Sequence, residues 1–331
     1  MKKFLTFLLI AILVLGGLEA VAISLNKVEY KTSTYLFDDE LDQSQTEFES
    51  GVPIGNYQIQ SNPHLNWTIA QSYTPSKEIQ TRVQLLLSKN STQLTIYPLV
   101  VCIREYLTGE NIGMLSIEPD EVPEFPDFLW IEFDFEDMLM TIPHNYFIVC
   151  YTTNETDNCY LWAGEGNNSY PNGQVYFSYD DGATWDDGPP WDTADMCFKT
   201  YGRDNNRPDL PEIVGETNGK IQTLYEYTVN SIDPDGDDIA YYLILWDDDA
   251  HTNKTGPFAS GESVTASHKW TKKGNYTILV RATDVFGKHS FWGELSVTMP
   301  RNKIAHNILS LRFLERYPLL NLLLQRLTFL Y

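Results

Sequence analysis

The sequence predicts an all-β protein with two β-sandwich domains and a short C-terminal amphipathic helical tail. Three observations support this. Short apolar runs alternate with Gly, Pro and Asp/Asn turn clusters along most of the chain. Residues 131–136 alternate strictly between apolar side chains and carboxylates, as in a strand with one buried face. A length of 331 residues leaves room for about two hydrophobic cores.

The N-terminal residues read as an export signal. Lys2 and Lys3 precede an apolar run over 4–18, and small residues at 20–22 offer a cleavage site. We therefore expect a signal peptide over 1–22, with a retained anchor as the alternative, and a tether over 23–37. The run is short for a bilayer span of about 20 residues. Either reading predicts an extracellular protein, secreted or associated with the cell surface.

The composition excludes one class of partner. The formal net charge is −22, from 45 acidic and 23 basic residues. Because nucleic acids are bound mainly by Lys and Arg that neutralise phosphates, we expect no nucleic-acid partner. Solubility and cation binding agree better with such an acidic chain.

A first β-sandwich is expected over 38–202. Its clearest strands are residues 81–85, 131–136, 146–151 and 196–201. The short spacing of the turns favours a jelly-roll-like sandwich. Residues 203–211 are polar and contain two prolines, which predicts a stiff linker.

A second domain is expected over 212–300, with strands at 225–229, 240–246, 267–270, 276–282 and 295–299. In the tail, 301–331, Ile304, Ile308, Leu311 and Leu314 follow helical spacing, and Pro318 interrupts the helix. Its apolar stretch, 319–330, contains Arg326 and is too short and too charged for a membrane span of about 20 residues. We expect the tail to contact a membrane surface or a partner, with packing on its own domain as the alternative.

The second domain resembles a polycystic kidney disease (PKD) type immunoglobulin-like domain. The motifs that carry the resemblance are the Asp233–Asp237 turn, the Trp246-Asp247 corner, His268-Lys269-Trp270, Gly274-Asn275-Tyr276 and the turn that closes at Gly287. The family often has Gly-Asp-Gly after the Trp, where this chain has three aspartates. The resemblance implies a domain that presents a binding surface, and a structural role for His268.

The first domain resembles the β-sandwich domains found beside PKD-like domains in exported archaeal and bacterial proteins. The segments that carry this resemblance are 42–45, 70–75, 130–133 and 198–202. Its motifs are loose, so the resemblance implies a fold more than a function.

Four cysteines in an exported chain favour two disulfides over a zinc site, because no CxxC pair is present. Three connectivities are open. Our choice is Cys150 with Cys159, which flank a turn-like stretch, and by elimination Cys102 with Cys197. Sequons for N-glycosylation, of which we expect only some to be used, begin at Asn66, Asn90, Asn154, Asn167, Asn253 and Asn275.

Two regions are candidates for ligand binding. Asp233, Asp235 and Asp237 alternate around Pro234 and Gly236 and could converge on Ca²⁺. The alternative is a turn whose carboxylates bond their own backbone. No cofactor is otherwise required.

The aromatic-rich region 160–191 is a candidate carbohydrate platform, with Trp162, Tyr170 and Trp191 as the expected exposed rings. The alternative is that these rings fill the sandwich. In the same region, Ser178 to Trp185 matches a single Asp box, a structural hairpin element that resembles those of sialidases and implies no glycosidase activity.

Common catalytic motifs are missing from the sequence, so we expect no enzyme activity. The sequence predicts a non-enzymatic exported protein for adhesion or envelope scaffolding, with a surface glycan or an envelope protein as partner. The alternatives are a secreted carbohydrate-binding protein and an accessory part of a glycan hydrolase system.

Overall fold

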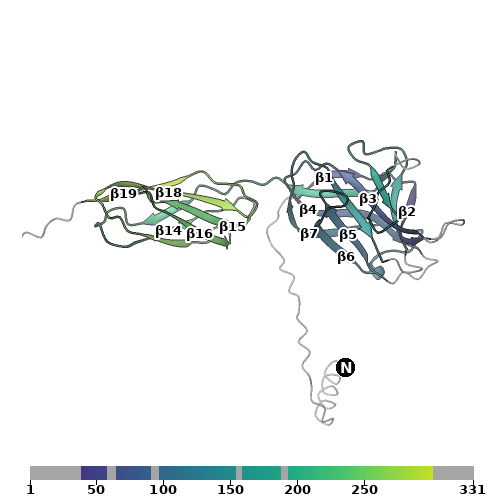
Figure 1. The fold of residues 1–331 in the computed structure, drawn as a ribbon, viewed down its shortest axis with the longest axis horizontal. Helices are drawn as coiled ribbons and strands as arrows, with labels where there is room; N and C mark the ends of the chain where they lie inside the picture. The colour runs from purple at the N-terminus through teal and green to yellow at the C-terminus, as the bar shows by residue number, and fades with distance from the viewer. Residues whose placement is uncertain (1–38, 58–64, 91–96, 154–158, 188–192, 301–331) are drawn as a thin grey trace, which may run out of the picture. The chain divides into compact units, whose positions relative to one another are not determined.

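The structure is a computed structural model that describes residues 39–57, 65–90, 97–153, 159–187 and 193–300 (Figure 1). The predicted signal peptide, tether and helical tail lie outside these residues, as do Asn154 and Trp191. The described part is built from strands and a 3-10 turn at Pro119–Glu121, so the predicted all-β class is confirmed. No helix among the described residues has the length and apolar character needed to cross a membrane.

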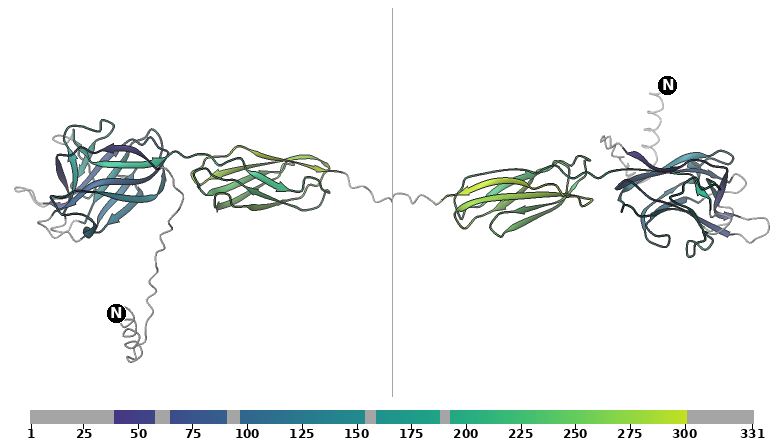
Figure 2. Two further views of the ribbon diagram at one scale, coloured as in Figure 1. Left: turned by 180° about the vertical axis from the view of Figure 1, so that it is seen from behind. Right: turned by 90° about the horizontal axis from the view of Figure 1, so that it is seen from above.

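The first sandwich contains twelve strands. They are β1 (Glu40–Gln45), β2 (Ser50–Tyr57), β3 (Leu65–Tyr73), β4 (Ile79–Lys89), β5 (Leu99–Arg104), β6 (Asn111–Ile117), β7 (Leu129–Leu139), β8 (Tyr146–Tyr151), β9 (Cys159–Glu165), β10 (Val175–Ser178), β11 (Asp195–Met196) and β12 (Phe198–Arg203). Figure 2 shows them from two further sides.

Eight of these strands have the order of a jelly roll. One layer runs β2-β9-β4-β7 and the other β3-β8-β5-β6, all antiparallel. Two such four-stranded layers define the double-sheet jelly roll. The jelly-roll-like prediction is therefore confirmed. β12 pairs with β4 and β1 with β12, so the chain ends of the domain extend the first layer.

The core between the layers forms because apolar residues alternate along each strand. In β7, Ile131, Phe133 and Phe135 are buried, whereas the carboxylates between them face solvent. The opposing layer contributes Val101 and Ile148, both fully buried. The period of two thus fixes which face of each strand enters the core.

The second sandwich contains seven strands in two layers. They are β13 (Glu212–Gly215), β14 (Tyr225–Asn230), β15 (Ile239–Leu245), β16 (His251–Phe258), β17 (Val264–His268), β18 (Gly274–Asp284) and β19 (Gly293–Met299). One layer is β13-β14-β17 and the other β16-β15-β18-β19.

Aromatic side chains fill the centre of the second sandwich. Trp246, Trp270, Tyr227 and Tyr242 are almost completely buried. His268 stacks on Trp246 with ring centroids 4.7 Å apart, and its Nε2 lies 2.9 Å from Asp248 Oδ2. His268 therefore packs and hydrogen-bonds, as the resemblance implied. In the neighbouring turn Asp247 and Asp249 adopt positive φ values of 60° and 65°, so the tight turn forms without the glycines.

The predicted disulfides are wrong, because all four cysteines are buried thiols that form no disulfide. Cys150 points into the core between the layers. Cys102 packs with Ala70 and Val149 on the outer face of one layer, and Cys197 packs with Leu86 and Ala163 on the outer face of the other.

The predicted Cys102–Cys197 bridge would have to cross the sandwich, whereas a disulfide joins Cα atoms usually 4.4–6.8 Å apart. Cys159 is also unsuitable as a partner for Cys150, because its strand neighbour Tyr160 occupies the core-facing position. Burial raises the pKa of Cys159 and of Cys197 to about 12, so both thiols stay protonated and unreactive near neutral pH.

Candidate metal centre

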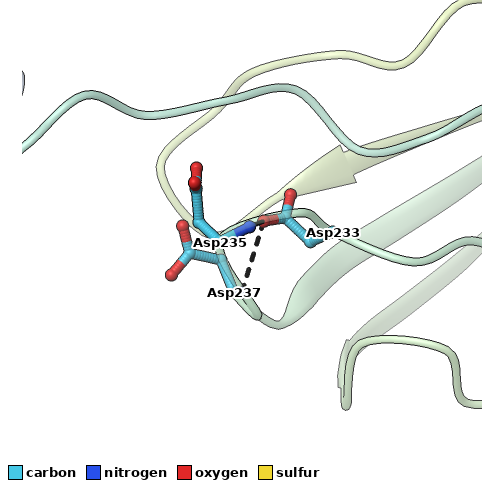
Figure 3. A group of neighbouring side chains, drawn as sticks. All are labelled: Asp233, Asp235 and Asp237. Carbon is cyan, nitrogen blue, oxygen red and sulfur yellow. Dashed lines mark hydrogen bonds between the residues drawn. The ribbon is translucent and has the colours of Figure 1, made fainter. Parts of the chain in front are cut away.

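The Asp233–Asp237 turn is the predicted site whose residues the structure brings together. It connects β14 to β15 in the second sandwich (Figure 3). One carboxylate oxygen from each of Asp233, Asp235 and Asp237 lies within 4.8 Å of the others. Gly236, at φ 77°, allows the reversal that places Asp237 beside Asp233.

Asp233 organises the turn through one carboxylate oxygen. Its Oδ1 accepts hydrogen bonds from the backbone N–H of Asp235 at 2.9 Å and of Asp237 at 3.3 Å. Its own N–H donates to Ser260 Oγ at 2.8 Å. The backbone-bonding alternative drawn from the sequence is therefore present in the structure.

The second carboxylate oxygen of Asp233, Oδ2, is buried and accepts no hydrogen bond from the described residues. Asp233 as a whole is only 2% exposed. Burial, reinforced by the charges of Asp237 and Asp235, raises the pKa of this carboxyl to about 6, against the opposing effect of the two amide hydrogen bonds. A buried carboxylate oxygen without a donor is an unused ligand atom for a hard cation.

The other two carboxylates already have partners. Arg203 forms a two-fold hydrogen bond with Asp237, at 2.7 and 3.1 Å, and lies 3.6 Å from Asp235. Asn206 donates from Nδ2 to Asp235 at 2.8 Å. The arginine guanidinium thus supplies part of the positive charge that a metal ion would otherwise bring. Sequence reasoning missed both residues, although the polar linker that contains them was a visible signal.

Two of the three rings of the predicted carbohydrate platform, Trp162 and Tyr170, are buried. Trp162 is fully buried and donates from Nε1 to the Cys197 carbonyl at 2.8 Å. Tyr170 is 6% exposed, packs edge-on against Phe198 and donates its hydroxyl to Gln43 Oε1 at 2.9 Å. The prediction was wrong for these two rings, because the apolar alternation of β9 directs Trp162 into the core. Trp191 lies outside the described residues.

The sequon asparagines differ in exposure. Asn66 is 5% exposed and its amide donates to Asp181, so the folded domain offers no accessible amide there. Asn90 is half-buried. Asn167, Asn253 and Asn275 are exposed.

No protein-family model matches this sequence, and no curated protein matches it significantly. Among solved structures, the PKD domain of an M14-like peptidase from Thermoplasmatales archaeon SCGC AB-540-F20 is 47% identical over 29% of this chain and 98% of that domain, with a TM-score of 0.28. A CARDB domain from Pyrococcus furiosus in complex with di-metal ions is 15% identical over 29% of this chain and 91% of its own, with a TM-score of 0.22.

Fibronectin(III)-like modules of Clostridium thermocellum CbhA are 12% identical over 71% of this chain and 97% of their own, with a TM-score of 0.28.

The fold of the second domain follows from its own strand pairing. Its first, second and fifth strands form one layer, and its third, fourth, sixth and seventh form the other. The second domain is an immunoglobulin-like β-sandwich. Its buried Trp246 and Trp270 lie between the layers, as expected for that architecture.

Proposed function

We propose that this chain is a non-enzymatic, exported cell-surface protein that serves adhesion or envelope scaffolding, with an envelope protein as its partner. The observation that carries the proposal is a pair of neighbouring aromatic side chains on the immunoglobulin-like domain, between β18 and β19. Phe291 is 68% exposed and Trp292 is 36% exposed. We call these two residues the aromatic face.

Each ring of the aromatic face has an arginine over it. The Arg207 guanidinium lies 4.6 Å from the Phe291 ring centroid, and that of Arg281 lies 4.9 Å from the Trp292 centroid. Trp, Tyr and Arg are the residues that most often dominate binding energy at protein interfaces. Because the rest of the chain is strongly acidic, two arginines here favour a partner whose contact surface carries carboxylates.

The test is retention of the full-length chain in the cell envelope. In cells that produce the protein, we expect the double variant Phe291→Ala/Trp292→Ala to bind the envelope about tenfold more weakly than the unaltered chain. Leu224→Ala is the matched control, since Leu224 is 64% exposed and lies elsewhere on the same domain. Equal retention of the double variant and the control would contradict the proposal.

We also propose that Asp233, Asp235 and Asp237 bind Ca²⁺. The unpartnered Asp233 Oδ2 supports this. Because Arg203 and Asn206 compete for the other oxygens, the expected affinity is that of extracellular modules, about 10⁻⁴–10⁻³ M. An ion here would relieve the burial of uncompensated charge and so stiffen the turn.

Calcium should therefore raise the thermal unfolding midpoint at neutral pH, and raise it less near pH 5, where Asp233 is protonated. Asp233→Asn keeps an Oδ1 acceptor for the two backbone amides but removes the charge, and it should abolish the calcium effect. Asp238→Asn is the control, because Asp238 is exposed and lies outside the cluster. A calcium effect that persists in Asp233→Asn would show that the ion binds elsewhere.

A further inference from the structure

A polar pocket of about 390 Å³ lies on the jelly-roll domain, on the outer face of the layer that contains β3, β5 and β8. Its volume falls in the range of small-ligand sites. The residues that line it come from those strands, from the segment that follows β8 and from the Asp-box turn, and they are Thr68, Arg104, Tyr151, Thr152, Thr153, Asp181 and Gly182.

The Asp box builds one wall of this pocket. Ser178 Oγ donates to Asp180 Oδ1 at 2.8 Å, and Asp180 accepts from the Thr184 N–H at 2.9 Å and from its hydroxyl at 2.7 Å. These bonds hold the hairpin in the form that the sequence motif predicts. They also fix Asp181, whose φ is 58°, at the pocket wall.

Arg104 also lines the pocket, and among the described residues it has no anionic partner. Its Nε donates to Asn111 Oδ1 at 2.7 Å and its Nη1 to the Leu107 carbonyl at 2.9 Å. Neutral oxygens therefore hold the guanidinium, and Arg104 forms no ion pair with any residue in the described ranges. In a chain with a net charge of −22, an arginine left without a carboxylate is available to an anionic ligand.

Asp181 supplies the complementary chemistry. It accepts a hydrogen bond from Asn66 but forms no ion pair with Arg104, although both line the same pocket. A ligand between them meets a cation on one side and a hydrogen-bond acceptor on the other. Thr68, Thr152 and Thr153 also line the pocket, and because the Thr152 hydroxyl donates to the Pro98 carbonyl at 2.8 Å, it can only accept from a ligand.

Tyr151 provides a flat apolar surface. Its hydroxyl lies 4.0 Å from Cys102 Sγ, so the ring extends along the sheet toward the strand that ends at Arg104. Beneath it, Ala70, Cys102 and Val149 form a buried apolar cluster against which Tyr151 packs. Sugar rings stack on such aromatic surfaces, while their hydroxyls need donors and acceptors at the edge.

We propose that this pocket binds an acidic sugar residue of the uronic acid class. Its carboxylate would pair with Arg104, its hydroxyls would donate to Asp181 and bond the threonines, and its ring would lie on Tyr151. This inference rests on the proposed surface function, because acidic glycans are met outside the cell. The site is independent of the aromatic face and of Trp162 and Tyr170.

The test uses the full-length purified protein and two probes, methyl glucuronide and the neutral methyl glucoside, titrated while NMR chemical shifts are recorded. We expect saturable binding of the glucuronide, at least about tenfold tighter than the glucoside, since one charge-assisted pair is worth roughly that factor. Arg104→Gln should abolish this preference. Lys220→Gln, which removes one positive charge from an exposed position on the other domain, should leave it unchanged.

Arg104→Lys separates folding from recognition, because it keeps the charge but loses the planar fork, and it should retain weaker glucuronide binding. Circular dichroism of each variant shows whether it is folded. Equal binding of the two probes, no binding of either, or an unchanged preference in folded Arg104→Gln would overturn the inference. These results do not test envelope retention, so the proposed function is tested separately by the Phe291→Ala/Trp292→Ala variant.

Discussion

Replacing Trp162 with alanine is expected to lower the free energy of unfolding by about 3–5 kcal/mol, as for other fully buried tryptophans. Trp162 has no exposed surface, belongs to the core between the jelly-roll layers and donates a hydrogen bond to the Cys197 carbonyl. Alanine would leave a cavity and also an unpaired buried carbonyl. Chemical denaturation of the variant measures the effect.

Trp292→Ala is the control for Trp162→Ala. Trp292 is 36% exposed, so its loss should change the free energy of unfolding by no more than about 1 kcal/mol. If Trp162→Ala were as stable as Trp292→Ala, the ring would not be packed in the core. The carbohydrate-platform interpretation of Trp162 would then return.

The second large effect concerns pH. Asp195 and Asp233 are each almost completely buried, and burial raises the pKa of each carboxyl to about 6. The unfolded value is about 3.8. Between these values the folded chain binds more protons than the unfolded chain, so stability falls as pH rises. The two carboxyls therefore stabilise the fold fully below about pH 4, and this stabilisation is lost as the pH rises through about 6.

Each carboxyl should contribute about 1–3 kcal/mol to this loss, since one pKa unit corresponds to about 1.4 kcal/mol. Burial also raises the pKa of Asp137 and Asp284, which acts in the same direction. Urea unfolding at pH 5 and pH 7.5, without calcium, measures the difference. In Asp233→Asn, the difference in the free energy of unfolding between the two pH values should be smaller by about 1–3 kcal/mol, the amount that Asp233 contributes. A chain more stable at pH 7.5 than at pH 5 would contradict the account.

Strong periodicity made part of the fold predictable. The strands at 131–136 and 146–151 lie in β7 and β8, because strict alternation or a continuous apolar run has few other interpretations. By contrast, the prediction missed β16. That strand lies at the edge of its layer, alternates between exposed and half-buried positions and contains Pro257, so no apolar pattern marks it.

The candidate sites also divide into those that the sequence predicts and those that it does not. Asp233, Asp235 and Asp237 were predictable because one short turn fixes their separation. Trp162 was misassigned because sequence context shows which residues surround a ring but not which face of the strand enters the core. Arg104 and Asp181 could not be placed together in advance, since a strand and a turn far apart in sequence bring them to one pocket. Long-range strand order decides such neighbours.

The aromatic face shows a further limit. Phe291 and Trp292 resemble core residues in type, and their exposure appears only when β18 and β19 are paired. Their position after the polar stretch Lys288-His289-Ser290 was the one signal available in the sequence.

Protease treatment of intact cells that produce the full-length chain tests the central claim most directly. A two-domain protein that works outside the cytoplasm should lose the epitope of its immunoglobulin-like domain without lysis, while a cytoplasmic marker in the same sample stays intact. Digestion of that epitope only after the cells are broken would place the chain inside the cell and contradict the account.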